Sequence, residues 1–244
     1  MTTTSYETVH ARDGGTFEAF RALPASGHGP GILLFQEIFG INDNMRGLAE
    51  KLAAVGYVVL VPDMFWRLEP RFERRDESGM ADAFAMVQRF DFEQGIEDIT
   101  ATHAHLISMP ACTGKVGAVG FCLGGSLAFA AAARSRVDGM GPDAAVSYYG
   151  SGNNALLGVL DQVECPVLFH YGTTDPFIPE DQIVEVEHAI AGRTGLTLER
   201  YDAGHAFSNW DAPSMYQPEA AELAWARTLE HFATHLADSA VHTG

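Results

Sequence analysis

Short apolar stretches recur along the chain and alternate with segments whose apolar residues are spaced as on one side of a helix. A continuous apolar run of about four to eight residues is typical of a strand buried on both faces of a sheet. The pattern predicts such strands at residues 31–38, 57–64, 115–121, 144–150, 165–172 and 197–203. Two more strands, at 6–11 and 16–23, flank a glycine-containing turn and are expected to form a hairpin at one sheet edge.

Helical spacing fills the intervals between these strands. Helices are predicted at 43–55, over much of 80–108, and at 123–134, 181–191 and 218–236. In the last of them, one apolar stripe is formed by Trp225, Leu229, Phe232 and Leu236. Alternation of buried strands with helices predicts an α/β protein with a mostly parallel sheet covered by helices on both faces. No linker or repeat divides the sequence, so we expect one domain over residues 1–244.

Charge narrows the classes of partner. The 244-residue chain has a formal charge of −17, which repels phosphate backbones and anionic lipid, so we expect neither a nucleic-acid nor a membrane partner. An anionic substrate is not excluded, because a local arginine or helix N-terminus can override the global field. The sequence shows no secretory leader and no apolar run of about 18 residues. Its three cysteines lack C-x-x-C spacing, which favours a reducing, cytoplasmic location.

The stretch AVGFCLGGS, residues 118–126, places Cys122 between a predicted strand and a predicted helix. A sharp strand-to-helix turn needs small neighbours, which Gly120 and Gly124 provide. The N-terminus of the following helix favours an anion, and the N–H of Leu123 would face an oxygen that develops charge beside the sulfur. A lone cysteine is more often a buried structural thiol. Cys122 is therefore a candidate nucleophile only if a base lies within reach.

A base and an acid follow in suitable places. Asp175 comes after the next-to-last predicted strand, and His205 comes after the last. Because the carboxyl ends of parallel strands meet at one edge of the sheet, both side chains are expected near Cys122. The order nucleophile, acid, histidine predicts a triad in which His205 takes the thiol proton and Asp175 orients the imidazole. Asp202 is an alternative partner for His205, but it lies too close in the chain to be preferred.

Four motifs extend this pattern over nearly the whole chain: QEIFG at 36–40, FDFEQG at 90–95, GFCLGG at 120–125 and AGHAF at 203–207. In this order they resemble the dienelactone hydrolase family of the α/β-hydrolase fold. The resemblance implies a cysteine hydrolase that cleaves a lactone or carboxylic ester through an acyl-enzyme intermediate. It also implies that the N–H of Ile38 is the second oxyanion donor and that Glu37 contacts the resting thiol. A salt bridge between Glu37 and a nearby arginine is the structural alternative.

The sequence departs from this family at its substrate pocket. Family members bind a substrate carboxylate with two arginines, and the corresponding positions here are Met80 and Asn209. The resemblance places Phe84 and Val87 in the same pocket. A bidentate arginine–carboxylate contact gives strong and specific binding. Its loss favours a neutral or apolar ester or lactone, which would suit a pocket formed by Met80, Phe84, Val87, Phe207, Asn209 and Trp210.

Other polar residues are interpreted as structural. Arg71, Arg74 and Arg75 are expected to be solvated surface charges. Ser126 falls inside a predicted helix, and His170 is expected to be a hydrogen-bonded core residue. His231 and His235 have metal-ligand spacing, but no third ligand accompanies them, so we expect surface residues.

The sequence implies no metal or cofactor and leaves the oligomeric state open. The competing hypothesis is a small-molecule binding protein that has kept the fold without turnover, which the two missing arginines favour. An intact triad has no evident use in such a protein, so the hydrolase is preferred.

Overall fold

The computed structural model describes residues 1–75 and 77–237 and contains one eight-stranded sheet with the strand order β1-β2-β4-β3-β5-β6-β7-β8. The first two strands pair antiparallel with one another, and β2 pairs antiparallel with β4. All remaining pairs are parallel. The strands are β1 Thr3–His10, β2 Thr16–Leu23, β3 Gly29–Phe35, β4 Val58–Pro62, β5 Cys112–Phe121, β6 Ala144–Tyr148, β7 Val167–Gly172 and β8 Leu196–Tyr201.

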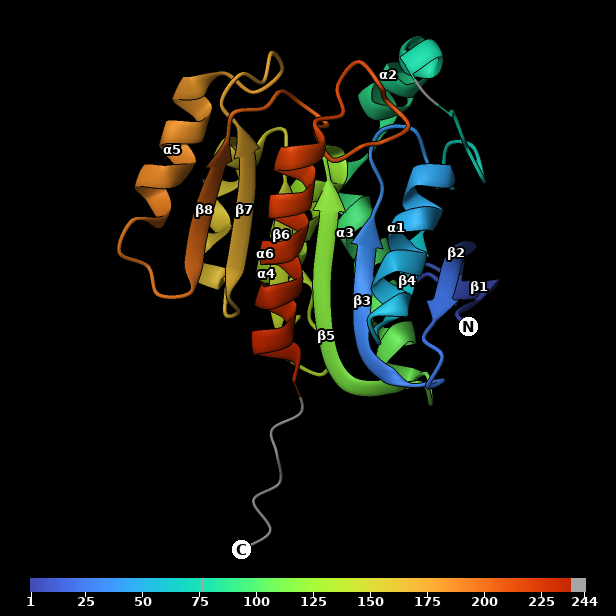
Figure 1. Ribbon diagram of the computed structural model, residues 1–244. Coiled ribbons are helices and arrows are strands. Elements are labelled where there is room, and N and C mark those ends of the chain that lie inside the picture. Colours follow the sequence, from blue (N-terminus) through green and yellow to red (C-terminus); the bar gives the residue numbers. More distant parts are fainter. Residues whose placement is uncertain (76, 238–244) are drawn as a thin grey trace, which may run out of the picture.

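Helices cover both faces of the sheet (Figure 1). Helices α1 and α6 pack on one face, whereas α3 and α4 pack on the other. The helices are α1 Asp43–Ala54, α2 Met80–Arg89, α3 Phe92–Ser108, α4 Leu123–Arg134, α5 Glu180–Ile190 and α6 Pro218–Leu236, with 3₁₀ helices η1 Glu77–Gly79 and η2 Asn153–Gln162. The predicted α/β architecture with a mostly parallel sheet is therefore confirmed. Within the described ranges, no helix is both long and apolar enough to span a membrane.

Two segments near the carboxyl edge of the sheet refine the predicted elements. Strand β3 ends at Phe35 rather than at residue 38. The apolar run continues because the following loop is buried under α4, where the carbonyl oxygens of Phe35 and Gln36 lie against Gly124. The helical region 80–108 is two helices, because Asp91 leaves the helical conformation and caps α3 by accepting a hydrogen bond from the N–H of Gln94 at 3.1 Å.

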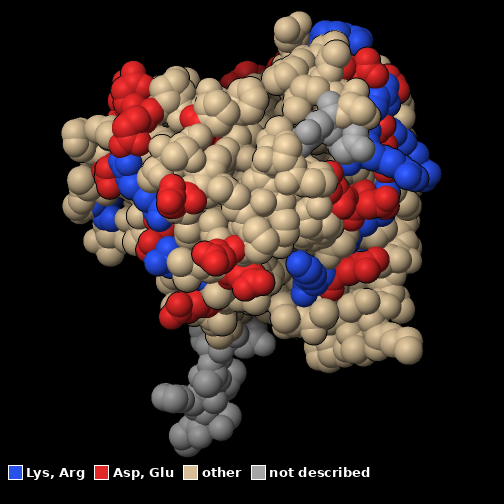
Figure 2. Space-filling model, turned by 45° about the horizontal axis from the view of Figure 1, so that its top comes forward, with Lys and Arg blue, Asp and Glu red and all other residues tan. Residues whose placement is uncertain are grey.

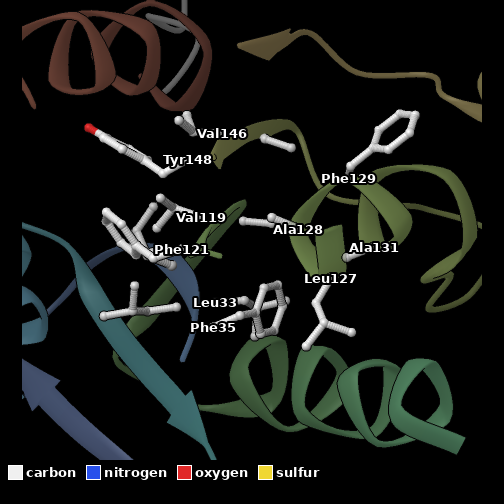
Figure 3. Packing of buried hydrophobic residues seen from close by; sticks show 14 of the residues in the cluster. Leu33, Phe35, Val119, Phe121, Leu127, Ala128, Phe129, Ala131, Val146 and Tyr148 are labelled. Carbon is white, nitrogen blue, oxygen red and sulfur yellow. The ribbon is translucent and has the colours of Figure 1, made fainter. Parts of the chain in front are cut away.

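The core packs α4 directly against the centre of the sheet (Figure 3). Ala128 and Ala131 of α4 are buried, whereas Phe121 lies on the opposite face of β5, where its ring stacks on Tyr148 with centroids 4.4 Å apart. Small residues on a helix allow its backbone to approach a sheet closely. This close packing fixes the start of α4, and with it the residue that precedes the helix.

Candidate active site

The three predicted catalytic residues follow three strands that end at the same edge of the sheet. Cys122 follows β5, Asp175 lies in the loop after β7, and His205 lies in the loop after β8. The β5–β6–β7–β8 pairs are all parallel, so these loops leave the sheet on one side. The structure brings the three residues together there, as predicted from their positions.

Cys122 occupies a strained turn. Its φ of 55° lies in the left-handed region, which non-glycine residues adopt rarely and mostly where function requires it. Its N–H donates to the carbonyl of Tyr148 at 3.0 Å, which ties the turn to β6. A Cβ on Gly120 would lie 2.0 Å from the carbonyl oxygen of Gly124, so only glycine fits there. The turn therefore presents the thiol at the N-terminus of α4.

His205 is held between Cys122 and Asp175. Its Nδ1 lies 2.7 Å from Oδ2 of Asp175, and His205 lines the same cavity as Cys122. The other carboxylate oxygen of Asp175 accepts hydrogen bonds from the N–H groups of Phe177 at 2.8 Å and Ile178 at 3.1 Å. Burial alone would lower the pKa of His205, but the charges and hydrogen bonds of Cys122 and Asp175 outweigh burial and raise it to about 10. The arrangement stabilises an imidazolium beside the sulfur.

The two proposed oxyanion donors lie next to the sulfur. Leu123 is the first residue of α4, and the first N–H groups of a helix have no partner within the helix. Ile38 lies in the loop after β3 and packs in the same small apolar cluster as Cys122 and Leu123. Both residues line the cavity that contains the thiol. Two N–H groups on opposite sides of a reacting carbonyl are the usual means of stabilising an oxyanion.

Glu37 is buried in a hydrogen-bond network that the sequence did not predict. Tyr149 donates from its hydroxyl to Oε1 at 3.1 Å, and Asn209 donates from Nδ2 to Oε2 at 2.6 Å. The N–H of Asp211 donates to the Asn209 amide oxygen at 3.0 Å, which fixes the orientation of that amide. Burial raises the pKa of Glu37 despite these hydrogen bonds and the nearby His205. Among the described residues Glu37 forms no salt bridge, so the arginine alternative was wrong.

Ser151 is a further polar neighbour of the thiol. Its Oγ lies 3.9 Å from Sγ of Cys122, and its carbonyl accepts a hydrogen bond from Oγ of Ser126 at 2.8 Å. Ser126 is buried within α4, as predicted, and anchors the loop that carries Ser151.

These groups open into an apolar cavity of about 260 Å³. The predicted pocket residues Met80, Phe84, Val87 and Asn209 line it. The cavity is also lined by residues that were not predicted, namely Phe39, Ser151, Phe177, Ala206, Ala212 and Met215. Neither arginine nor lysine lines it within the described part of the chain. Figure 2, with the top of Figure 1 turned forward, shows uncharged surface in its centre and charged side chains toward its edges.

Two predicted pocket residues were wrong. Phe207 has no exposed surface and packs behind the site against Tyr149 and Tyr201, with ring centroids 5.2 Å away in each case. Trp210 lies outside this cavity beside Leu48 of α1, and the Lys51 ammonium lies 4.2 Å from its ring. The reason is local: the backbone of Ala206 has a φ of 53°, which reverses the chain just after His205. A sequence pattern does not reveal such a reversal.

The residues interpreted as structural mostly lie where expected. Arg71 pairs with Glu18, and Arg74 pairs with Asp82 at 2.9 Å, so both are surface ion pairs outside the cavity. His170 is a core residue that hydrogen-bonds to Tyr201 at 2.8 Å and Thr228 at 3.1 Å. Arg75 is also exposed.

The pair of histidines in α6 departs from expectation. His231 is only partly exposed, and burial lowers its pKa to about 4, so it is not a solvated surface residue. Its ring lies 4.8 Å from that of His235. Over the described ranges, no group of three His, Cys, Asp or Glu side chains is placed to hold a metal ion.

Comparison with known proteins agrees with this architecture. The family model described as "Dienelactone hydrolase family" matches residues 17–236. A carboxymethylenebutenolidase from Pseudomonas sp. (strain P51) is 38% identical over 224 residues, which cover 91% of this chain and 92% of that protein. The carboxymethylenebutenolidase of Pseudomonas putida is 36% identical, with 92% and 94% covered. A solved Klebsiella pneumoniae structure provisionally assigned as a dienelactone hydrolase superposes with a TM-score of 0.82 at 26% identity, over 96% of this chain and 99% of that one.

The sheet, its helical layers and this solved relative define an α/β-hydrolase fold. Within that class, the chain belongs to the dienelactone hydrolase family. It is accordingly a hydrolase that acts on ester or lactone bonds.

Proposed function

We propose that this protein hydrolyses a neutral, largely apolar carboxylic ester or lactone with Cys122 as nucleophile, His205 as base and acid, and Asp175 as orienting carboxylate. The observation that carries the proposal is the hydrogen bond between His205 and Asp175, with His205 and Cys122 lining one apolar cavity. A thiol paired with an imidazole is the arrangement that nucleophilic acyl transfer requires.

The first half-reaction forms a thioester. The thiol proton moves to His205, and the sulfur attacks the substrate carbonyl to form an S–C bond. The N–H groups of Ile38 and Leu123 stabilise the resulting oxyanion, in a cavity whose low polarity strengthens these hydrogen bonds. As the C–O bond breaks, His205 gives its proton to the departing alkoxide oxygen, and Asp175 stabilises the imidazolium until then.

The second half-reaction restores the enzyme. His205 takes a proton from water, which attacks the thioester carbonyl and forms a second oxyanion. When this intermediate collapses, the S–C bond breaks, the carboxylic acid leaves and the proton returns to sulfur. In a lactone the alcohol stays tethered to the acyl group, so the first half-reaction releases nothing and the second releases a single hydroxy acid.

The lining of the cavity supports a neutral substrate. Met80 and Asn209 supply no cation, and Asn209 already uses its amide N–H on Glu37. Met80, Phe84 and Val87 offer apolar contact instead. Placing a carboxylate in such a lining without a charged partner is unfavourable.

A comparison of cysteine variants tests the mechanism. We expect Cys122→Ala to reduce the hydrolysis of p-nitrophenyl acetate by several orders of magnitude, whereas Cys112→Ala, which removes a thiol outside the cavity, leaves the rate close to that of the unmodified protein. Equal rates for the unmodified protein and Cys122→Ala would contradict the mechanism and support the small-molecule binding protein.

A substrate panel tests the choice of substrate separately. Neutral and anionic lactones and esters of similar size are ranked by kcat/KM. We expect the neutral members to lead, and a strong preference for cis-dienelactone would overturn the inference from Met80 and Asn209.

A further inference from the structure

The catalytic groups fix the direction in which an ester lies in the cavity, provided that the proposed function holds. The carbonyl oxygen must face the N–H groups of Ile38 and Leu123. The oxygen of the departing alcohol must face His205, because His205 protonates it. The acyl chain then extends away from His205. The two halves of a substrate therefore meet different walls of the cavity.

The wall beside His205 is formed by Phe177. The ring centroids of Phe177 and His205 are 5.2 Å apart in an edge-to-face arrangement, and Phe177 lines the cavity. The turn that anchors Asp175 holds Phe177 in place, since its N–H donates to that carboxylate. Although it is aromatic, Phe177 is 51% exposed, so one side of its ring is free for contact. A flat, exposed ring next to the proton donor suits an aromatic alcohol group.

The wall on the other side is formed by α2. Met80 and Val87 pack in a small apolar cluster with Ile38, Leu123 and Cys122. The buried residues of this cluster differ from those of the main core, and Cys122 and Leu123 pack against both. Figure 1 shows α2 above β3 and β4, while α5, which begins shortly after Phe177, lies at the far end of the same edge beside β8.

We infer that Met80 and Val87 of α2 select the acyl chain and that Phe177 selects the alcohol, so that the two halves of the substrate are recognised by independent sets of residues. The substrate class that fits is an ester of an apolar acid with an aromatic alcohol. The α2 wall presents Met80 and Val87, which are partly buried, together with Phe84, which is 43% exposed, whereas the Phe177 wall presents one ring that is 51% exposed.

Two substrate pairs measure the two preferences separately. The ratio of kcat/KM for p-nitrophenyl butyrate and p-nitrophenyl acetate reports on the acyl chain. The ratio for benzyl acetate and ethyl acetate reports on the alcohol. Because each ratio is taken within one variant, the fraction of correctly folded protein cancels.

We expect Val87→Phe to lower the butyrate-to-acetate ratio about tenfold by filling the acyl side, with the benzyl-to-ethyl ratio within about twofold of its original value. Phe177→Ala is expected to lower the benzyl-to-ethyl ratio about five- to tenfold and to keep the acyl ratio within about twofold. Leu223→Ala, an exposed change on α6 outside the cavity, is the control and should move neither ratio.

The inference is overturned if Val87→Phe changes the benzyl-to-ethyl ratio, or Phe177→Ala changes the butyrate-to-acetate ratio, by more than about twofold. It is also overturned if Val87→Phe leaves the butyrate-to-acetate ratio, or Phe177→Ala leaves the benzyl-to-ethyl ratio, within about twofold of the original value. These outcomes differ from a failure of the proposed function. If the proposed function is wrong, Cys122→Ala hydrolyses p-nitrophenyl acetate as fast as the unmodified protein. If only the assignment of the two cavity walls is wrong, hydrolysis still depends on Cys122.

Discussion

At the scale of single residues, the site depends on hydrogen bonds that hold side chains in one orientation. Asp175 uses one carboxylate oxygen for two backbone N–H groups and the other for His205. The backbone bonds prevent the carboxylate from turning, so the imidazole meets one fixed acceptor. Fixed acceptors of this kind set which ring nitrogen of a histidine carries the proton.

Asp175→Asn should therefore impair catalysis more than folding. Asparagine can keep the two backbone hydrogen bonds through its oxygen, but its amide N–H then faces Nδ1 of His205 and favours the wrong tautomer. We expect kcat for p-nitrophenyl acetate to fall about 10³- to 10⁴-fold, with a much smaller change in KM. Steady-state kinetics and a urea unfolding curve on the same preparation check both parts. A kcat within about tenfold of the original would argue against this role for Asp175.

At the scale of elements, the start of α4 and the end of β3 form one unit. A Cβ on Gly124 would lie 2.3 Å from the carbonyl oxygen of Phe35 and 2.6 Å from that of Gln36. The same backbone continues directly into Glu37 and Ile38. The spacing between helix and loop thus sets the distance between the two proposed oxyanion donors.

We expect Gly124→Ala to destabilise the protein by about 1–3 kcal/mol and to lower kcat, because the helix must move away from the loop. Gly158→Ala is the matched control, since a Cβ there meets no atom within 4 Å. It should change the free energy of unfolding by less than about 0.5 kcal/mol. Chemical denaturation and p-nitrophenyl acetate kinetics measure the two effects. Equal behaviour of the two variants would show that the close approach does not matter.

Asp63, just beyond β4, makes stability depend on pH. Its carboxylate accepts hydrogen bonds from the N–H groups of Arg71 at 2.6 Å and Phe65 at 3.1 Å, yet burial raises its pKa to about 6. An unfolded aspartate titrates near pH 3.9. Between about pH 4 and 6 the folded state keeps a proton that the unfolded state has released, so the free energy of unfolding falls as pH rises.

The measurement compares the unmodified protein with Asp63→Asn, which cannot titrate. From pH 4 to pH 7, the unmodified protein should lose about 2–3 kcal/mol of stability relative to the variant. Urea unfolding at several pH values gives this difference directly. A difference that is constant with pH would mean that the pKa of Asp63 is not raised.

The elements also explain how far the sequence could predict the site. Cys122, Asp175 and His205 could be located because each follows a recognisable strand, and parallel strands end together. Phe207 and Trp210 were misplaced because the backbone at Ala206 is left-handed and turns the chain. The spacing of apolar residues in the sequence does not reveal such a turn. Tyr149 was missed for a similar reason: its φ of 36° directs a buried side chain toward Glu37, 112 residues away in the sequence.

At the scale of the whole molecule, the charge of −17 acts on every approaching ligand. The potential around such a protein repels anions over about 10 Å at moderate ionic strength. Within the described residues the cavity offers no lysine or arginine to offset it. We therefore expect an anionic ester to be disfavoured both at a distance and on contact.

The long-range repulsion between the protein's net charge and an anionic ester should weaken as salt is added. For a neutral ester and an anionic ester of the same size, raising the ionic strength from about 0.01 M to 0.5 M should increase the anionic-to-neutral ratio of kcat/KM about two- to fivefold. Sodium chloride titration at constant pH provides the measurement. A ratio that does not change with salt would leave the contact inside the cavity as the sole source of discrimination.

The turn at Asp175 has a consequence for how this enzyme can diversify. One carboxylate both orients His205 and holds Phe177, so a substitution in residues 175–178 alters chemistry and alcohol preference together. Helix α2 carries Met80, Phe84 and Val87 on an element that supplies none of the three triad residues. Directed evolution of new specificities should therefore gain most from libraries in α2, where a substitution leaves the Asp175–His205 hydrogen bond in place.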